Sequence, residues 1–345
     1  MKNTYFRLFI ILTCVITLSL ALCSCNNSKS SRSVVVYTSV DQVYSEPILK
    51  EFEKKTGIKV DAVYDVEATK TVGLSNRLIS EKNKPRADVF WNGEFTQTLL
   101  LKESGVLAPY KSSYAEDIPD AFKDKDNYWT GFGGRARVLL VNRNLLGTSQ
   151  YPRSINDLAD DKYKGSMIGL AYPLFGTTSS HAAALYAAWG DEKAKNFFLK
   201  LNEKGVVIAD GNSAVKDLVA SGKLAMGLVD TDDALEAVNK GKPVDVVFLD
   251  QGEGELGTLV SPNTVALISG APHTDTGKEF IDFLLSREIE KNLIEKGWID
   301  IPVRPVGSSK FLKDGQKLVL MKVNFNEVYG KLQKSRDDLQ KIFIR

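Results

Sequence analysis

The sequence Gly227-Leu-Val-Asp-Thr-Asp-Asp-Ala234 is the starting point for the fold. The apolar run that leads into it, Leu224 to Val229, predicts a buried strand. The strand ends at Asp230, and two more carboxylates, Asp232 and Asp233, follow within three residues. Ligands of α/β sheets bind at the carboxyl ends of strands, so we expect at least one of these aspartates to contact a ligand. The alternative is that one of them only caps a helix that begins near Ala234.

Strand and helix patterns alternate along the rest of the chain. Val34–Tyr37 and Ile58–Tyr64 predict strands, and a helix with Ser45 as its cap and Pro47 in its first turn separates them. This order predicts a right-handed βαβ unit. The polar loop after its first strand contains Asp41, which we expect to contact the ligand. The alternation continues with strands expected at 87–91, 138–141, 166–172, 206–209, 244–249 and 257–268, and with helices expected at 69–82 and 323–341 and before Gly105, Gly190 and Gly222.

Two further segments are candidates for binding an anion. Gly131-Phe-Gly-Gly-Arg-Ala-Arg137 is expected to be a loop that leads into a strand, so it is not a dinucleotide-binding loop, which opens a helix. Its Arg135 and Arg137 offer bidentate contacts to an anion, and they share a face if the segment is extended. Thr177, Thr178 and Ser179 stand at a predicted helix start, where backbone N–H groups bind anions and where the same residues also act as ordinary caps.

The composition and motifs give little support for catalysis or nucleic-acid binding. The chain has two histidines and contains no Gly-x-Ser-x-Gly elbow, Walker loop or His-Glu-x-x-His pair. Asp230-x-Asp232 resembles the start of a calcium-binding loop, but the later glycine and glutamate are missing. Paired carboxylates can perform acid–base chemistry, but no nucleophile or electrophile accompanies them. We therefore expect a protein that binds a ligand, is not an enzyme and does not bind nucleic acid.

The first 33 residues have the features of an export signal followed by a lipid anchor. Lys2 and Arg7 precede an apolar run, 8–22, that is short for a membrane span. Leu22-Cys-Ser-Cys25 resembles the bacterial lipobox, so we expect removal of residues 1–24, lipidation of Cys25 and a flexible tether over 25–33. All three cysteines lie in this region, which leaves no disulfide in the exported body. Loss of the two basic residues lowers the formal charge from +2 to zero.

An exported α/β chain with polar loops at its strand ends resembles the extracellular solute-binding proteins of bacterial ABC importers. Its order of short segments is similar to the ferric-iron-binding branch of the type II-like periplasmic binding proteins. The segments that carry this resemblance span nearly all of the folded body; they are Val34–Ser39, Phe52–Ile58, Ala87–Trp91, Gly105–Pro109, Gly134–Val138, Lys216–Gly222 and Ser261–Ile268.

The resemblance implies a two-lobed α/β fold in which each lobe is a mixed, mostly parallel sheet flanked by helices. Two crossing strands, at 138–141 and 259–266, would form the hinge. The first lobe would comprise residues 34–136 plus 265–305, the second lobe 142–260, and a C-terminal helical segment 306–345. A protein of this kind closes on its ligand in the cleft between the lobes and presents it to a permease and its ATPase. We expect a monomer, anchored by lipid in the bacterial cell envelope on the periplasmic or extracellular face of a membrane.

The ligand is less clearly implied, because the tyrosine pair that holds Fe(III) in this branch would stand where Asp230–Asp233 stands. Carboxylate oxygens also bind hard cations, so Fe(III) is our first expectation, with Glu67, Asp230 and Asp232 as its ligands beside a synergistic anion. The alternative is a small anionic or zwitterionic organic solute, such as a phosphonate or a sugar phosphate. Its amine or hydroxyl groups would meet the aspartates and Glu67, and its anionic end would meet an arginine and the helix start at Thr177. A secreted enzyme that uses the carboxylates, or a receptor without an importer, remains as a further alternative.

Overall fold

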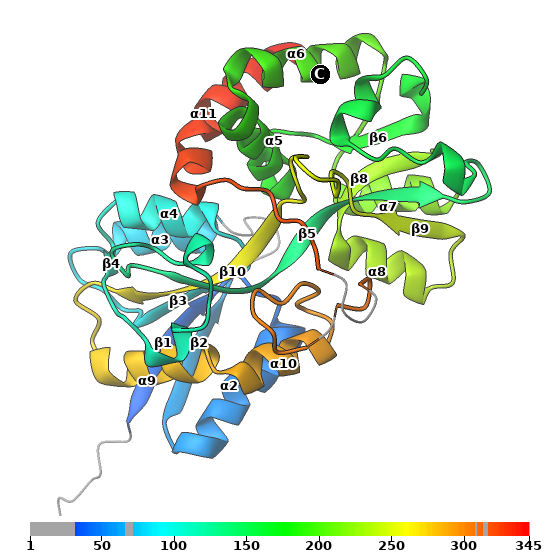
Figure 1. The fold of residues 1–345 in the computed structure, drawn as a ribbon. Helices are drawn as coiled ribbons and strands as arrows, with labels where there is room; N and C mark the ends of the chain where they lie inside the picture. The colour runs from blue at the N-terminus through cyan, green and yellow to red at the C-terminus, as the bar shows by residue number, and fades with distance from the viewer. Residues whose placement is uncertain (1–31, 66–71, 308, 313–316, 345) are drawn as a thin grey trace, which may run out of the picture.

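A computed structural model of the chain describes residues 32–65, 72–307, 309–312 and 317–344. The lipobox with Cys25 and the predicted ligand Glu67 lie outside the described residues. The described chain forms two α/β lobes, which lie below and above one another in Figure 1 and are joined by two long strands. This arrangement confirms the two-lobed α/β fold.

One sheet runs through both lobes in the strand order β2-β1-β3-β10-β5-β8-β6-β7. The first three strands of the chain pair in parallel in the first lobe, and a second parallel set lies in the second lobe. The first set is β1 (Ser33–Thr38), β2 (Lys59–Tyr64) and β3 (Val89–Asn92), and the second set is β6 (Ile168–Ala171), β7 (Val207–Ala209) and β8 (Met226–Asp230). Two short strands, β4 (Leu107–Ala108) and β9 (Val244–Val247), pair with the joining strands.

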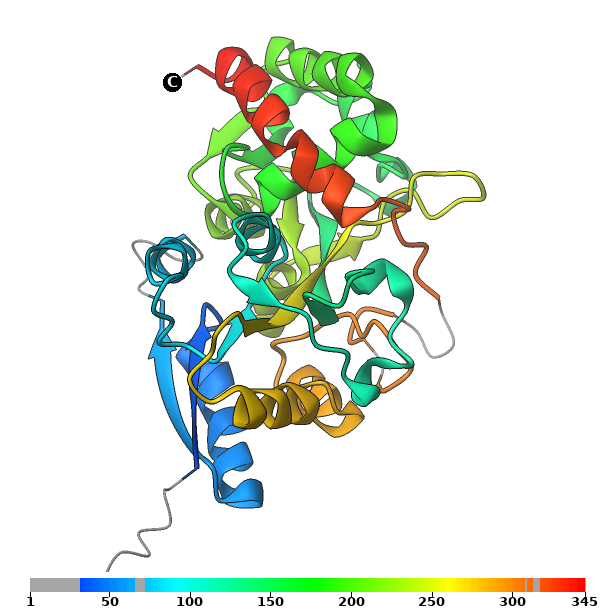
Figure 2. The ribbon, with the colours of Figure 1, turned by 90° about the vertical axis from the view of Figure 1, so that its left-hand side faces the viewer.

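The joining strands are β5 (Thr130–Asn142) and β10 (Val260–Ile268), which pair with each other antiparallel. β10 also pairs with β3 in the first lobe. β5 pairs with β10 up to Ala136 and with β8 of the second lobe from Arg137 onward. The two halves of the sheet therefore meet along β5, between Arg135, which pairs with β10, and Arg137, which pairs with β8. Figure 2 shows the joining strands passing from one lobe to the other.

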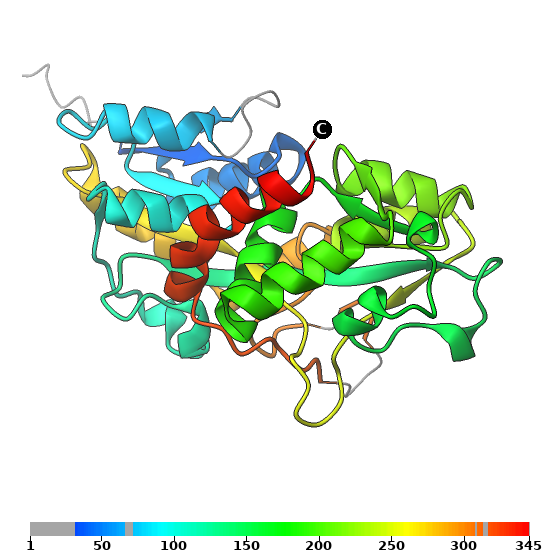
Figure 3. The same cartoon turned by 90° about the horizontal axis from the view of Figure 1, so that it is seen from above.

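Helices cover the faces of the sheet in each lobe. The first lobe contains α2 (Gln42–Thr56), α3 (Gly73–Ser80), α4 (Thr96–Glu103), α9 (Thr274–Leu284) and α10 (Arg287–Glu295). The second contains α5 (Gly176–Trp189), α6 (Asp191–Glu203), α7 (Asn212–Ala220) and α8 (Thr231–Asn239). The last helix, α11 (Phe325–Ile342), lies against α5 and α6 (Figure 3). Short 3-10 helices occupy Ser113–Ala115, Asp120–Phe122, Thr148–Gln150, Ile155–Ala159 and Gly165–Met167.

The glycine-rich segment 131–137 belongs to β5, so the prediction of a loop there was wrong. Its glycines allow neighbouring backbone to approach the strand. A Cβ on Gly134 would lie 2.6 Å from the carbonyl oxygen of Ser261, and one on Gly131 would lie 2.9 Å from that of Phe122. Glycine serves here as a site of close packing.

The start of α2 also differs from the prediction. The helix begins at Gln42 with Asp41 in the N-cap position, and Ser45 lies inside its first turn. The Ser45 hydroxyl donates to the carbonyl oxygens of Val40 and Asp41 instead of capping the helix. In the part of the chain that the structure describes, every helix falls short of the length and apolar character needed to cross a membrane.

Candidate functional site

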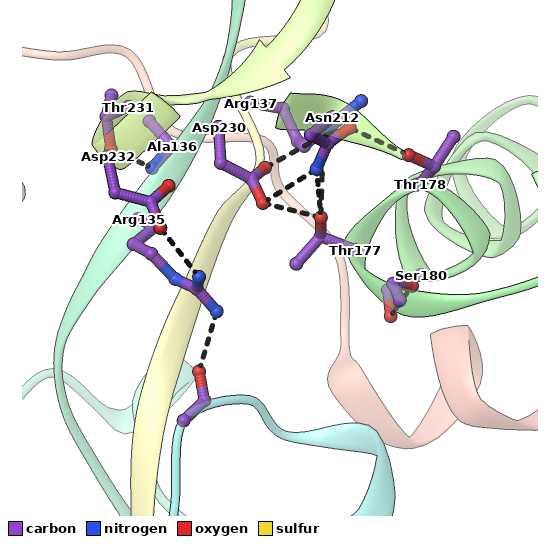
Figure 4. A network of polar contacts seen from close by, with 12 residues as sticks. Arg135, Ala136, Arg137, Thr177, Thr178, Ser180, Asn212, Asp230, Thr231 and Asp232 are labelled. Carbon is purple, nitrogen blue, oxygen red and sulfur yellow. Dashed lines mark hydrogen bonds and ion pairs between the residues drawn. The ribbon is translucent and has the colours of Figure 1, made fainter. Parts of the chain in front are cut away.

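Two arginines of β5 meet the acidic end of β8. The antiparallel register places Arg137 opposite Asp230, and the extended strand puts Arg135 on the same face. Arg137 donates from Nη1 to Asp230 Oδ1 at 2.8 Å, and Arg135 donates from Nη1 to Asp232 Oδ2 at 2.9 Å (Figure 4). Both arginines therefore reach the aspartates, as an extended segment requires.

Asp230 does more than terminate the strand. It occupies the N-cap position of α8, which begins at Thr231 and not near Ala234, but its side chain makes no capping hydrogen bond. Its Oδ2 accepts hydrogen bonds from Thr177 Oγ1 at 2.5 Å and Asn212 Nδ2 at 3.2 Å. Burial acts to raise the pKa of Asp230, but the charges of Arg137 and Arg135 and the hydrogen bonds from Thr177 and Arg137 outweigh it and lower the pKa. Helix capping does not account for this carboxylate.

The start of α5 completes the network around Arg137. Asn212 accepts hydrogen bonds from Arg137 Nη1 at 3.1 Å and Thr178 Oγ1 at 3.2 Å, and it donates to Thr177 Oγ1 at 3.0 Å (Figure 4). Asn212 is the first residue of α7, and Gly211 holds the N-cap position of that helix. Ser179 lies apart from this network, because its hydroxyl accepts a hydrogen bond from Arg336 of α11 at 3.1 Å.

Arg135 connects the acidic strand end to the first lobe. Its Nη2 donates to the carbonyl oxygen of Gly93, which follows β3, at 3.2 Å. Its guanidinium lies 5.5 Å from the ring centroid of Trp298, and Trp298 in turn lies 4.9 Å from the ring of Tyr44. An aromatic wall from the first lobe and a carboxylate from the second therefore hold the same cation.

Buried polar atoms without a hydrogen-bond partner gather at this place. Nine such side-chain atoms occur among the described residues, and six of them belong to this site: Nε of Arg135, Nε and Nη2 of Arg137, Oδ1 of Asp232, Oγ of Ser261 and Oδ2 of Asp300. Ser261 lies on β10 directly opposite Arg135. A buried polar group without a partner is unfavourable and rare, so the concentration of such groups here makes this place the candidate ligand site.

The site contains more carboxylates than resident cations. Burial, together with the charges of Asp232 and Asp230, raises the pKa of Asp233 to about 7. Burial also raises the pKa of Asp300, again to about 7, although Thr231 donates a hydrogen bond to it. Oxygen atoms of Asp230, Asp232 and Asp233 lie within 4.8 Å of one another, a spacing that suits a metal ion. Two of these three carboxylates are already paired with arginines.

The remaining candidates lie at the edge of the site or outside it. Asp41 is at the start of α2 and acts on the site through its charge, which adds to burial and to the charge of Asp232 in raising the pKa of Tyr44. His181 of α5 is buried, and burial together with Arg137 lowers its pKa to about 3, so it is neutral near pH 7. Glu67 is outside the described residues.

Sequence reasoning missed the contributions of Asn212, Ser261, Trp298 and Asp300. One feature of the sequence could have pointed to Asp300: it is a carboxylate inside the apolar segment Trp298-Ile-Asp-Ile301.

Known proteins with similar sequences and folds bind small solutes. A Salmonella typhi protein named for binding 2-aminoethylphosphonate is 28% identical over 285 residues, which cover 79% of this chain and 80% of that protein. The ferric binding protein from Campylobacter jejuni has the same fold, with a TM-score of 0.79, 24% identity and coverage of 90% of this chain and 100% of its own. The periplasmic binding protein AfuA from Actinobacillus pleuropneumoniae, solved with fructose-6-phosphate, has a TM-score of 0.71, 26% identity and coverage of 90% and 98%.

The family model for bacterial extracellular solute-binding proteins matches residues 37–291, which include most of both lobes and every residue of the Arg135–Asp232 and Arg137–Asp230 pairs. The two-lobed fold agrees with this match. The chain belongs to the bacterial extracellular solute-binding protein family.

Proposed function

We propose that this chain is the substrate-binding subunit of an ABC import system and captures a small organic solute with an anionic group. The family membership, and a relative named as a binding periplasmic protein, support a binding protein that is not an enzyme. The solute would lie between the lobes, and closure around it would present a surface to a permease that works with an ATPase. The chain would act as a monomer.

The main support for an anionic group in the ligand is the free edge of the Arg137 guanidinium. Its Nη1 is occupied by Asp230 and Asn212, while Nε and Nη2 are buried and have no partner. These two nitrogens form the edge of a guanidinium that holds a carboxylate or phosphate in a bidentate manner. Thr177, from the first turn of α5, lies on the same network, and the N-terminus of a helix favours an anion.

The ligands of similar proteins support the same chemical class. One relative is named for an aminoalkylphosphonate, and one structural neighbour contains a sugar phosphate. Both compounds combine a phosphorus oxyanion with amine or hydroxyl groups. An oxyanion at Arg137 and polar groups toward Asp232, Asp300 and Ser261 would give partners to the atoms that lack them.

Fe(III) with a synergistic anion is the second candidate, favoured by the close approach of Asp230, Asp232 and Asp233 and by the ferric-binding neighbour. Hard carboxylate oxygens suit this ion. To bind it, Asp230 and Asp232 would have to give up their arginine partners, and the arginines would then take the anion. That exchange is the reason we place iron second, although Glu67 offers one more possible carboxylate.

The test is calorimetric titration of the purified protein with 2-aminoethylphosphonate, fructose-6-phosphate, inorganic phosphate and ferric citrate. We expect at least one phosphorus oxyanion to bind the wild-type protein, and Arg137→Lys to bind it at least tenfold more weakly. Ferric binding without any response to the oxyanions would overturn the proposal in favour of the second candidate.

The amino-terminal features complete the proposal. We infer that residues 1–24 are removed as a signal peptide, that Cys25 carries the lipid and that residues 25–33 tether the body to a membrane of the cell envelope. We keep 34–136 plus 265–305 as the first lobe, 142–260 as the second and 306–345 as the C-terminal segment. The close packing of α11 on α5 supports the view that much of the last segment moves with the second lobe.

A further inference from the structure

We propose that the solute also carries an ammonium group, held between Asp232 and Asp233 of α8 and Asp300 of the first lobe, against the rings of Tyr44 and Trp298. This inference rests on the proposed function, because it assigns a second subsite to the same ligand. The solute class is then a zwitterion that joins an oxyanion to an amine.

Asp300 is the main support for this subsite. Only 2% of its surface is exposed, and its Oδ2 is buried without a hydrogen-bond partner. Thr231 of α8 donates a hydrogen bond to the same carboxyl group, and Asp232 acts on it electrostatically. Asp300 of the first lobe therefore faces the start of α8 in the second lobe. Oδ1 of Asp232 is also buried and unpartnered, so two acceptors at the junction of the lobes lack a donor.

The balance of charge shows what kind of donor is missing. Arg137 pairs with Asp230 and Arg135 pairs with Asp232, which leaves Asp233 and Asp300 without a paired cation among the described residues. Lys216 influences Asp233 but is bound to Glu236 at 2.6 Å, and Lys310 acts on Asp300 without an ion pair. Burial without a counterion is unfavourable for an ionised carboxylate, and Oδ2 of Asp300 and Oδ1 of Asp232 are both buried without a donor. A cationic ligand group would stabilise the ionised form.

The aromatic residues suit an organic ammonium better than a metal ion. Tyr44 and Trp298 form a pair with ring centroids 4.9 Å apart, and the guanidinium of Arg135 already lies against the Trp298 ring. The charges of Asp232 and Asp300 both act on the Tyr44 hydroxyl, so these rings and carboxylates surround one place. Carboxylates beside aromatic faces are the chemistry that recognises ammonium groups.

The test compares two ligands that differ only in the amine, 2-aminoethylphosphonate and ethylphosphonate, by calorimetric titration of the wild-type protein. We expect the amine to tighten binding by roughly 10- to 100-fold, the range for a hydrogen bond to a charged group. Asp300→Asn and Asp233→Asn should each reduce that preference, which is the ratio of the affinities for the two ligands measured in the same variant. Asp161→Asn serves as the control, because Asp161 is exposed and is far in the sequence from Asp233 and Asp300. It should change neither affinity.

The outcomes separate this inference from the proposed function. Equal affinity of the wild-type protein for the two ligands would overturn the ammonium subsite and leave the oxyanion site standing. Absence of binding for both, while ferric citrate binds, would overturn both proposals. An unchanged preference for the amine in both aspartate variants would show that the ammonium group binds elsewhere. Melting curves of the variants confirm that each is folded before its affinity is measured.

Discussion

Arg137 and Asp230 form an ion pair that is almost entirely removed from solvent, with 2% and 4% of their side chains exposed. Removing one partner of such a pair leaves the other charge buried alone, at a cost of about 3–5 kcal/mol. A test of function at this position therefore has to keep the charge.

Arg137→Lys meets that condition, because an ammonium group can still face Asp230 while the Nε–Nη2 edge is lost. We expect the free energy of unfolding to fall by about 1–3 kcal/mol, as for a lost charged hydrogen bond, and oxyanion affinity to fall at least tenfold. Arg143→Lys is the control, because Arg143 makes a more exposed pair with Asp245 that should contribute less than about 1 kcal/mol. Urea denaturation and titration measure the two effects. Equal oxyanion affinity in both variants would show that the free edge of Arg137 does not bind the ligand.

Asp300 makes stability depend on pH. Its pKa in the folded protein is about 7, against an ordinary value near 3.9 in the unfolded chain. The folded state binds this proton more tightly, so the stabilisation is fully present below about pH 4 and is lost as the pH rises through 7. Asp300→Asn keeps an acceptor for Thr231 and removes the charge. We expect its melting temperature to exceed that of the wild type by several degrees at pH 8 and by clearly less at pH 5.5. A variant that is less stable than the wild type at pH 8 would contradict this account.

The sequence predicted those site residues whose positions follow from their place in a single strand or at its end. Asp230 and Asp232 follow a strand, and Arg135 and Arg137 alternate along another, so their positions were visible in the chain. The approach of Asn212, Ser261 and Asp300 depends on which strands and loops are neighbours in space, and no local pattern contains that information. The pairing of Arg137 with Asp230 was missed for the same reason, since the register of β5 and β8 creates it.

Among the individual elements, β5 shows how a glycine-rich segment can form a strand. Gly134 faces the backbone of β10 so closely that an added Cβ would lie 2.6 Å from Ser261 O and 2.8 Å from Val260 Cγ1. Apolar runs and alternation were sufficient to predict β1, β2, β8 and β9. Glycine favours loops in isolation, and its use for close packing between strands becomes visible only when the partner strand is known.

Gly134→Ala should therefore strain the contact between β5 and β10. We expect a loss of about 1–3 kcal/mol in the free energy of unfolding, as for overpacking in a core. Gly330→Ala is the matched control, because Gly330 lies inside α11 with nothing within 4 Å of the added carbon and should gain up to about 1 kcal/mol. Urea denaturation measures both. If Gly134→Ala were as stable as the wild type, the two strands would have room that the structure does not give them.

At the scale of the whole molecule, α11 contacts both lobes. Its body packs on α5, while Phe325 at its start packs against Phe95, Phe122 and Trp129 of the first lobe. Phe325→Ala should lower the free energy of unfolding by about 3–5 kcal/mol, the usual cost of removing a buried phenylalanine. Ile344→Ala, at a side chain that is 81% exposed, should change it by less than about 0.5 kcal/mol. Similar stability of the two variants would show that the start of α11 does not hold the first lobe.

The proposed lipid anchor makes a prediction for the whole protein in its cell. Cys25→Ser should move the protein from the membrane fraction to the soluble fraction, because the lipid is lost while the folded body is unchanged. Cys23→Ser, two residues away, should leave the protein in the membrane fraction. Fractionation followed by immunoblotting distinguishes the two. Retention of the Cys25→Ser variant in the membrane would exclude this cysteine as the anchor.

The central claim is that the arginines and aspartates between the lobes hold an organic zwitterion. Native mass spectrometry, combined with metal analysis of the same protein purified without chelator from its natural host, tests this most directly. We predict a bound organic mass that is released on denaturation, is absent from the Arg137→Lys variant and comes with no stoichiometric metal. Protein that carries one iron per chain and no organic zwitterion would contradict the account.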